Sequence, residues 1–125
     1  MSKELPSVRL TFRQNRLYIN KYALACLGNP QFIELLYNEE NQILLVSSST
    51  EATENSIFVT PRAYQPRVCE FSITRKPLTE GFRLRLGLKA DDSYRIFGYY
   101  EPNIEMVVFD IKKGEKIAVS SKASV

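Results

Sequence analysis

The side chains of this chain that are best suited to chemistry are arginines, lysines and tyrosines that recur at three places. Arginine and lysine bind the phosphates of a nucleic-acid backbone, and the release of condensed counterions drives that binding. Tyrosine stacks on bases and is common in protein interfaces. The candidate binding residues are Arg9, Arg13, Arg16 and Lys21 in a first set, Arg75 and Lys76 in a second, and Tyr99 and Tyr100 in a third.

The segment that carries Arg9 and Arg13 alternates apolar and polar residues. Such alternation from Ser7 to Arg13 predicts a strand with both arginines on its solvated face. Asn15 and Arg16 then turn the chain, so a strand face and its turn present several cations to one backbone. A merely solvated strand face is the alternative interpretation, and for the tyrosines the alternative is packing in the core.

Residues needed for most familiar enzyme sites are missing from the sequence. The chain has no histidine, which is the commonest general base and a frequent zinc ligand. Its carboxylate pairs, at 39–40 and 91–92, lie at predicted turns, where acidic residues are common for conformational reasons. No glycine-rich phosphate loop or metal-ligand spacing is found. The sequence therefore predicts a protein that is not an enzyme and that uses no cofactor and no metal.

Length and composition predict a single domain of the cytoplasm. The chain has 125 residues, of which 44% are hydrophobic and 25% charged. No apolar run approaches the roughly 20 residues of a membrane span, and two distant cysteines, Cys26 and Cys69, are typical of small buried side chains in a reducing compartment. A net charge of +3 permits contact with nucleic acid or an acidic protein. We expect no membrane partner, and a monomer or homodimer.

The element order predicts two related halves, at about residues 7–48 and 57–111. In each half a short helix ends at a Leu-Gly pair, where glycine supplies the left-handed conformation, and a hairpin follows. The first half is predicted to hold strands at 7–13 and 17–19, a helix at 21–27 and a hairpin at 31–48. The second is predicted to hold strands at 57–60 and 68–73, a helix at 78–86 and a hairpin of 94–100 with 105–111. A flexible tail is predicted for 112–125.

Motifs in the first half follow one another in a recognisable order. A strand leads through Asn15-Arg16 to a short strand that ends at Ile19-Asn20, and a two-turn helix ending at Leu27-Gly28 precedes a hairpin at 32–46. This order resembles the swapped-hairpin DNA-binding domain of the AbrB, MazE and MraZ families of bacterial regulators and antitoxins. The resemblance implies a mostly β, α+β fold in which two β-α-β-hairpin repeats form a swapped-hairpin-like pseudo-dimer barrel.

The same resemblance implies a function, a DNA-binding transcriptional regulator or antitoxin. The family's phosphate contacts carry over to Arg9, Arg13 and Arg16, whereas its helix positions hold Leu24 and Ala25, which cannot bind phosphate. With its Leu-Gly-Asn-Pro step at 27–30, followed by a hydrophobic hairpin, the chain is also similar to small proteins carried by phages and integrative elements of Gram-positive bacteria. That similarity implies the context of a mobile element. The alternative function is then a protein-binding module such as an inhibitor of a host defence nuclease, an anti-CRISPR, which would direct a basic and aromatic face at an acidic partner or a nucleic-acid channel. Its partner would be a host protein or nucleoprotein.

Overall fold

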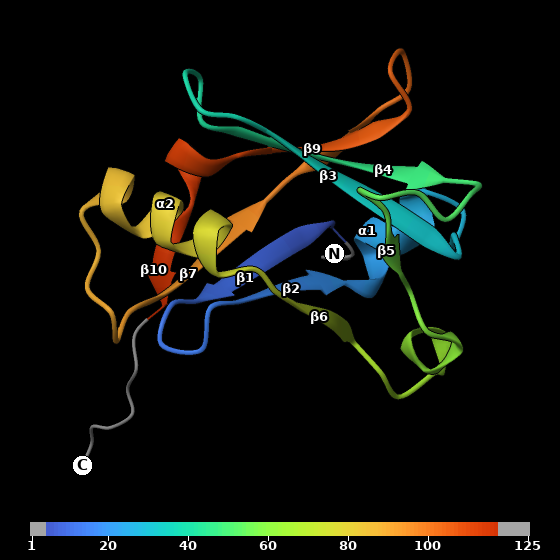
Figure 1. Ribbon diagram of the computed structural model, residues 1–125, viewed down its shortest axis with the longest axis horizontal. Coiled ribbons are helices and arrows are strands. Elements are labelled where there is room, and N and C mark those ends of the chain that lie inside the picture. The colour runs from blue at the N-terminus through green and yellow to red at the C-terminus, as the bar shows by residue number, and fades with distance from the viewer. Residues whose placement is uncertain (1–4, 118–125) are drawn as a thin grey trace.

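Two antiparallel sheets of five strands each make up the protein, and Figure 1 shows them as two layers. The computed structural model describes residues 5–117. Sheet A has the order β10-β7-β1-β2-β6, and sheet B has the order β5-β3-β4-β9-β8. The strands of sheet A are β1 (Ser7–Thr11), β2 (Arg16–Asn20), β6 (Glu70–Thr74), β7 (Ser93–Phe97) and β10 (Glu115–Ile117). Those of sheet B are β3 (Phe32–Asn38), β4 (Ile43–Ser49), β5 (Ile57–Phe58), β8 (Tyr99–Glu101) and β9 (Met106–Asp110).

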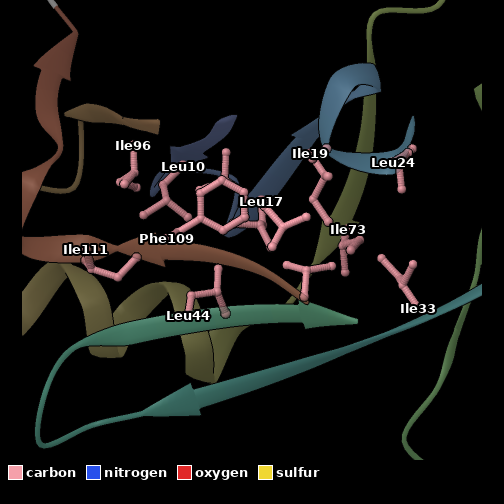
Figure 2. Close-up of a cluster of buried hydrophobic side chains, with 14 of the residues drawn as sticks. Leu10, Leu17, Ile19, Leu24, Ile33, Leu44, Ile73, Ile96, Phe109 and Ile111 are labelled. Atoms are coloured by element: carbon pink, nitrogen blue, oxygen red, sulfur yellow. The ribbon is translucent and has the colours of Figure 1, made fainter. Parts of the chain in front are cut away.

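The hydrophobic core lies between the two sheets. Alternate residues of each strand point inward, as the period of two in a strand requires. Figure 2 shows side chains of sheet A, such as Leu10 and Leu17, directed toward Phe109 and Leu44 of sheet B. All four are fully buried. The alternation that predicts these strands therefore also identifies the face that builds the core.

Two α-helices lie between the sheets, at opposite ends of the molecule (Figure 1). They are α1 (Lys21–Cys26) and α2 (Lys76–Leu86), and short 3-10 helices follow at η1 (Pro61–Tyr64) and η2 (Ile111–Lys113). The ring of Phe82 on α2 is fully buried and meets Tyr37 of sheet B edge to face, at 4.5 Å between centroids. Arg85 extends from α2 to Glu39 at the β3–β4 turn. Neither helix is long enough to be stable alone, and each depends on this packing.

Asn20 joins the start of α1 to the start of β1. Its side-chain Oδ1 accepts hydrogen bonds from the backbone N–H groups of Ala23, at 2.9 Å, and Ser7, at 3.1 Å. Its Nδ2 donates to the carbonyl oxygen of Leu5, at 2.8 Å. The sequence predicts the helix cap, the bond to Ala23. The bonds to Ser7 and Leu5 could not be predicted in this way, because only the fold brings that segment near Asn20.

Replacing Asn20 with alanine is expected to lower the free energy of unfolding by about 1–2 kcal/mol, the range typical of a lost helix cap. The reason is that two backbone N–H groups lose their acceptor. Asn20→Asp keeps an acceptor oxygen at this position and should lower the free energy of unfolding clearly less. Urea denaturation of the two variants measures the difference, and an equal loss in both would contradict the capping role of Oδ1.

A single run of chain from Ser93 to Glu101 belongs to both sheets. It pairs with β1 in sheet A as β7, passes Gly98, and pairs with β9 in sheet B as β8. A Cβ atom at Gly98 would lie 2.3 Å from the carbonyl oxygen of Val108 and 2.5 Å from Cδ1 of Phe109. Only glycine fits this crossing.

The crossing corrects the predicted second hairpin of 94–100 with 105–111. Only β8 pairs with β9, whereas β7 lies in the other sheet. The mostly β, α+β class is confirmed, with two open five-stranded sheets and two short helices. Residues 5–117 contain no closed barrel, in contrast to the predicted barrel.

Several boundaries also differ from the prediction. The first strand ends at Thr11 instead of Arg13, because residues 12–15 form a turn in which Asn15 has a φ of 55°. The predicted flexible tail from 112 begins with ordered structure, since β10 pairs with β7; residues 118–125 lie outside the described part. The two cysteines are free, but Cys69 is exposed where a buried side chain was expected. No helix within residues 5–117 is long and apolar enough to cross a membrane.

Candidate phosphate-binding cluster

Four cations from two distant segments lie at one end of sheet A. The backbone N–H of Arg75 donates to the carbonyl oxygen of Asn15, at 3.0 Å, and Arg16 is paired with Thr74 in the β2–β6 register. The Thr79 hydroxyl donates to Oδ1 of Asn15, at 3.1 Å. These bonds hold the β1–β2 turn against the first turn of α2. They bring Arg16 close to Arg75 and Lys76, and Arg13 lies in the same β1–β2 turn, on the side of Asp91. These four residues, Arg13, Arg16, Arg75 and Lys76, are hereafter the basic cluster.

The members of the basic cluster differ in how far they are already neutralised. Arg13 forms an ion pair with Asp91, at 2.6 Å, but both side chains are more than 70% exposed, and such a pair contributes little and is easily exchanged. Arg16, Arg75 and Lys76 are exposed and take part in no ion pair among residues 5–117. α2 also begins without a side-chain cap or an acidic residue in its first turn. Its N-terminal partial charge therefore adds to the positive potential.

Arg9 is used inside the protein. Its guanidinium makes two hydrogen bonds to the Glu70 carboxylate, with Nη2–Oε1 at 2.6 Å and Nε–Oε2 at 3.2 Å, and lies 4.0 Å from the ring centroid of Tyr18. The hydrogen bond to Glu70 raises the pKa of Arg9, although partial burial opposes that rise. Arg9 thus links β1 to β6. The sequence predicts that Arg9 holds a phosphate, but its guanidinium is already bound to Glu70.

Lys21 lies at the opposite end of sheet A from the basic cluster. It is the first residue of α1, at the far end of β2 from Arg16, and its Nζ lies 5.4 Å from the ring centroid of Tyr22. It lines a shallow groove between α1 and η1. On the same helix Leu24 faces the core and is buried. The four cations predicted to form the first patch are therefore not one patch.

Tyr99 and Tyr100 lie on β8, at the edge of sheet B and away from the basic cluster. Tyr99 is paired with Val108 on the outer face of the sheet, and Tyr100 is paired with Val107 on the inner side. Both rings are exposed. The structure does not bring them beside the arginines, so stacking on bases held by the basic cluster is not supported.

Charge is divided between the two layers of the protein. The segments that build sheet B, residues 31–58 and 98–111, contain no lysine or arginine. The rest of the described chain has fifteen lysines and arginines against five acidic residues. Residue spacing alone does not show this division, because it depends on which strands share a sheet. The eight carboxylates of sheet B and its loops are Glu34, Glu39, Glu40, Glu51, Glu54, Glu101, Glu105 and Asp110.

The outer face of sheet B carries apolar side chains that sequence reasoning missed. Leu36, Leu45, Val108 and Tyr99 follow one another across four strands on that face. The available signal is that residues 35–37 and 43–46 are apolar on both strand faces, where a half-exposed strand alternates.

No arrangement of three His, Cys, Asp or Glu side chains suited to a metal ion is found in residues 5–117. The candidate site of this protein is therefore the basic cluster. Comparisons with protein-family models, with curated proteins and with solved structures give no match for this chain.

Proposed function

We propose that this protein is a non-catalytic DNA-binding regulator or antitoxin that holds backbone phosphates with its basic cluster. The observation that carries the proposal is the meeting of Arg16 with Arg75 and Lys76, from segments about sixty residues apart. Three neighbouring cations without an acidic partner in the described chain repel one another, and a phosphate backbone relieves that repulsion. Contacts of this kind supply affinity but carry no base sequence information.

The division of charge supports the same orientation. The acidic layer, sheet B, faces away when the basic end of sheet A approaches a polyanion, because sheet B would be repelled. Arg9 is not part of this interface, since Glu70 holds it. The contact set is therefore Arg13, Arg16, Arg75 and Lys76.

The swapped-hairpin pseudo-dimer is the finer part of this proposal. Its support is that α1 and α2 both terminate at a Leu-Gly step with glycine in the left-handed region, at Gly28 (φ 81°) and Gly87 (φ 67°). Its test is superposition of the halves 7–48 and 57–111 in a crystal of the protein. Leu27 and Leu86, both half-buried, should coincide when the strands that follow the helices are aligned. Failure would leave the DNA proposal to stand on the basic cluster alone.

The double variant Arg16→Ala/Arg75→Ala is expected to bind DNA more weakly, by a similar factor for unrelated sequences. Each lost phosphate contact should make the slope of log affinity against log salt shallower by about 0.9, so that the pair changes it by about 2. Fluorescence anisotropy with labelled duplexes at several salt concentrations measures both quantities. Folding should be preserved, because both side chains are exposed.

The matched control is Arg62→Ala/Arg67→Ala, which removes two exposed arginines outside the basic cluster. It changes net charge equally, so an equal loss of affinity would indicate a general charge effect and contradict the proposed site. Wild-type binding is measured first. An affinity no tighter than about 0.1 mM near physiological salt is what incidental contact gives, and that result would end the proposal in favour of the alternative, a protein-binding module.

A further inference from the structure

An apolar row crosses the outer face of sheet B from β3 to β8. Leu36 is paired with Leu45, Leu45 with Val108, and Val108 with Tyr99. Paired residues of antiparallel strands point to the same side of a sheet. The inward neighbours Leu44 and Phe109 are fully buried, so the row faces away from the core.

The row is open to solvent at its ends and closely packed at its centre. Leu36 is 44% exposed and Tyr99 is 57% exposed. Val108 is only 8% exposed although it does not belong to the core cluster, because its neighbours on the same face cover it. Both helices lie on the other side of sheet B (Figure 1). A contiguous apolar face of this kind typically marks an interaction surface.

Two glutamates lie along one side of this row. In the adjoining row of paired residues, Glu34 and Glu101 stand at the two ends, with Ser47 and Met106 between them. Neither glutamate forms an ion pair among residues 5–117; Glu34 accepts a hydrogen bond from Thr53, and Glu101 accepts one from the backbone N–H of Asn103.

The two sides of the row differ in how their charge is balanced. On the side of the row opposite the two glutamates, the carboxylate of Asp110 forms an ion pair with Lys112, with Nζ–Oδ1 at 3.0 Å. No lysine or arginine occurs in the strands of sheet B, so the glutamates keep their charge uncompensated within the sheet. The face is therefore apolar at its centre and anionic along one side.

This combination selects the chemistry of the occupant. A second copy packed face to face would offer no lysine or arginine from the strands of its own sheet B, so the glutamates would be buried without a partner of opposite charge, which is costly. Nucleic acid and anionic lipid surfaces are repelled by the like charge of the glutamates. An apolar surface with lysines or arginines at its rim gains both from burial and from charge complementarity.

We propose that the outer face of sheet B is a docking site for a partner protein whose contact surface combines apolar side chains with lysines or arginines. The site adjoins the basic cluster at one edge, where Arg75 lines a pocket together with Glu34 and Leu36, but it uses a different face and does not depend on DNA binding. It also differs from the alternative drawn from the sequence, in which a basic and aromatic face meets an acidic partner. The protein then has two faces of opposite charge, each with its own kind of partner.

The experiment uses a synthetic peptide of alternating lysine and valine as the probe, because in an extended form it presents one cationic and one apolar face. Two control peptides alternate glutamate with valine and lysine with serine. In amide chemical-shift titrations of the whole protein, the lysine–valine peptide should shift residues of β3, β4, β9 and β8. Both control peptides should bind at least about tenfold more weakly, because each lacks one half of the complementarity. Shifts confined to sheet A, or equal binding of either control peptide, would overturn the proposal.

The variant Leu36→Ser/Tyr99→Ser should weaken binding of the lysine–valine peptide by about tenfold or more, as expected when interface anchors are removed. The matched control is Leu84→Ser, which removes a side chain that is 69% exposed on α2, outside this face. Glu34→Gln/Glu101→Gln should also weaken binding and reduce its salt dependence, whereas Glu115→Gln on sheet A should not. Equal affinities of all these variants would contradict the site.

Two further measurements separate this proposal from others. Sedimentation of the wild type at increasing concentration should show a monomer, and a dimer that Leu36→Ser/Tyr99→Ser abolishes would overturn the proposal by assigning the face to a second copy. Arg16→Ala/Lys76→Ala removes two cations of the basic cluster and leaves Arg75, which borders Glu34, in place. This variant should bind the lysine–valine peptide as the wild type does, so failure of DNA binding leaves this test unaffected. Unchanged thermal midpoints of the serine variants confirm that a loss of binding is not a loss of fold.

Discussion

Phe109→Ala is expected to lower the free energy of unfolding by about 3–5 kcal/mol, the cost of removing a buried aromatic ring and leaving a cavity. The ring is fully buried on the inner face of β9, where it lies between the two sheets (Figure 2). Its neighbours belong to strands of both sheets and cannot move in to fill the space without breaking their ladders. Single domains are stable by about 5–15 kcal/mol, so this variant should lose a large share of its stability. Urea denaturation followed by far-ultraviolet circular dichroism measures the loss.

Phe97→Ala is the matched control for Phe109→Ala. Phe97 is 49% exposed at the end of β7, next to the crossing between the sheets. Its removal leaves no enclosed cavity, so the loss should stay near or below about 1 kcal/mol. If the two variants were equally destabilised, the core would not lie where the structure has it.

Gly98→Ala is expected to destabilise the protein by about 1–3 kcal/mol although it adds only one methyl group. The new Cβ would meet the backbone carbonyl of Val108 and the ring of Phe109, at 2.3 and 2.5 Å. A backbone oxygen cannot rotate away as a side chain can, so β8 and β9 must separate locally. Thermal and urea unfolding measure this loss.

The control for Gly98→Ala is Gly81→Ala. Gly81 lies within α2, and a Cβ there would have no neighbour within 4 Å. Alanine in a helix interior is favoured over glycine by about 0.8–1.0 kcal/mol. The same substitution should therefore stabilise the protein at one site and destabilise it at the other. A loss of stability at both sites would show that the predicted steric conflict is not the cause.

Local pattern predicts the elements of this fold better than their partners. The alternation from Ser7, the capping side chain of Asn20 and the glycines at 28 and 87 each act through near neighbours in the chain, and the structure has them as expected. The crossing at Gly98 could not be predicted in this way. Strand periodicity is the same whichever sheet a strand joins, so 93–101 reads as one strand of one hairpin. The edge strand β10 was missed because its residues carry little apolar pattern.

The candidate site shows the same division between local and distant information. The sequence identifies exposed cations at Arg13, Arg16 and Arg75, but spacing places them in two separate patches. Their meeting depends on a backbone hydrogen bond between residues 15 and 75, and the loss of Arg9 from the set depends on Glu70, which is 61 residues away in the chain. The outer face of sheet B was missed because strand segments that are apolar on both sides, such as 35–37 and 43–46, resemble fully buried ones.

The separation of charge between the layers gives the molecule a large electric dipole moment. The segments of sheet B carry a net charge of −8 and the rest of the described chain +10, in layers packed about 10 Å apart. In the field of an approaching polyanion such a molecule experiences a torque that turns its basic side forward before any contact is made. Encounters then begin in a favourable orientation, which raises the association rate more than the lifetime of the complex. At physiological salt this steering acts only over about 8 Å. As the salt concentration is raised, the acceleration of association should therefore be lost before the complex itself dissociates.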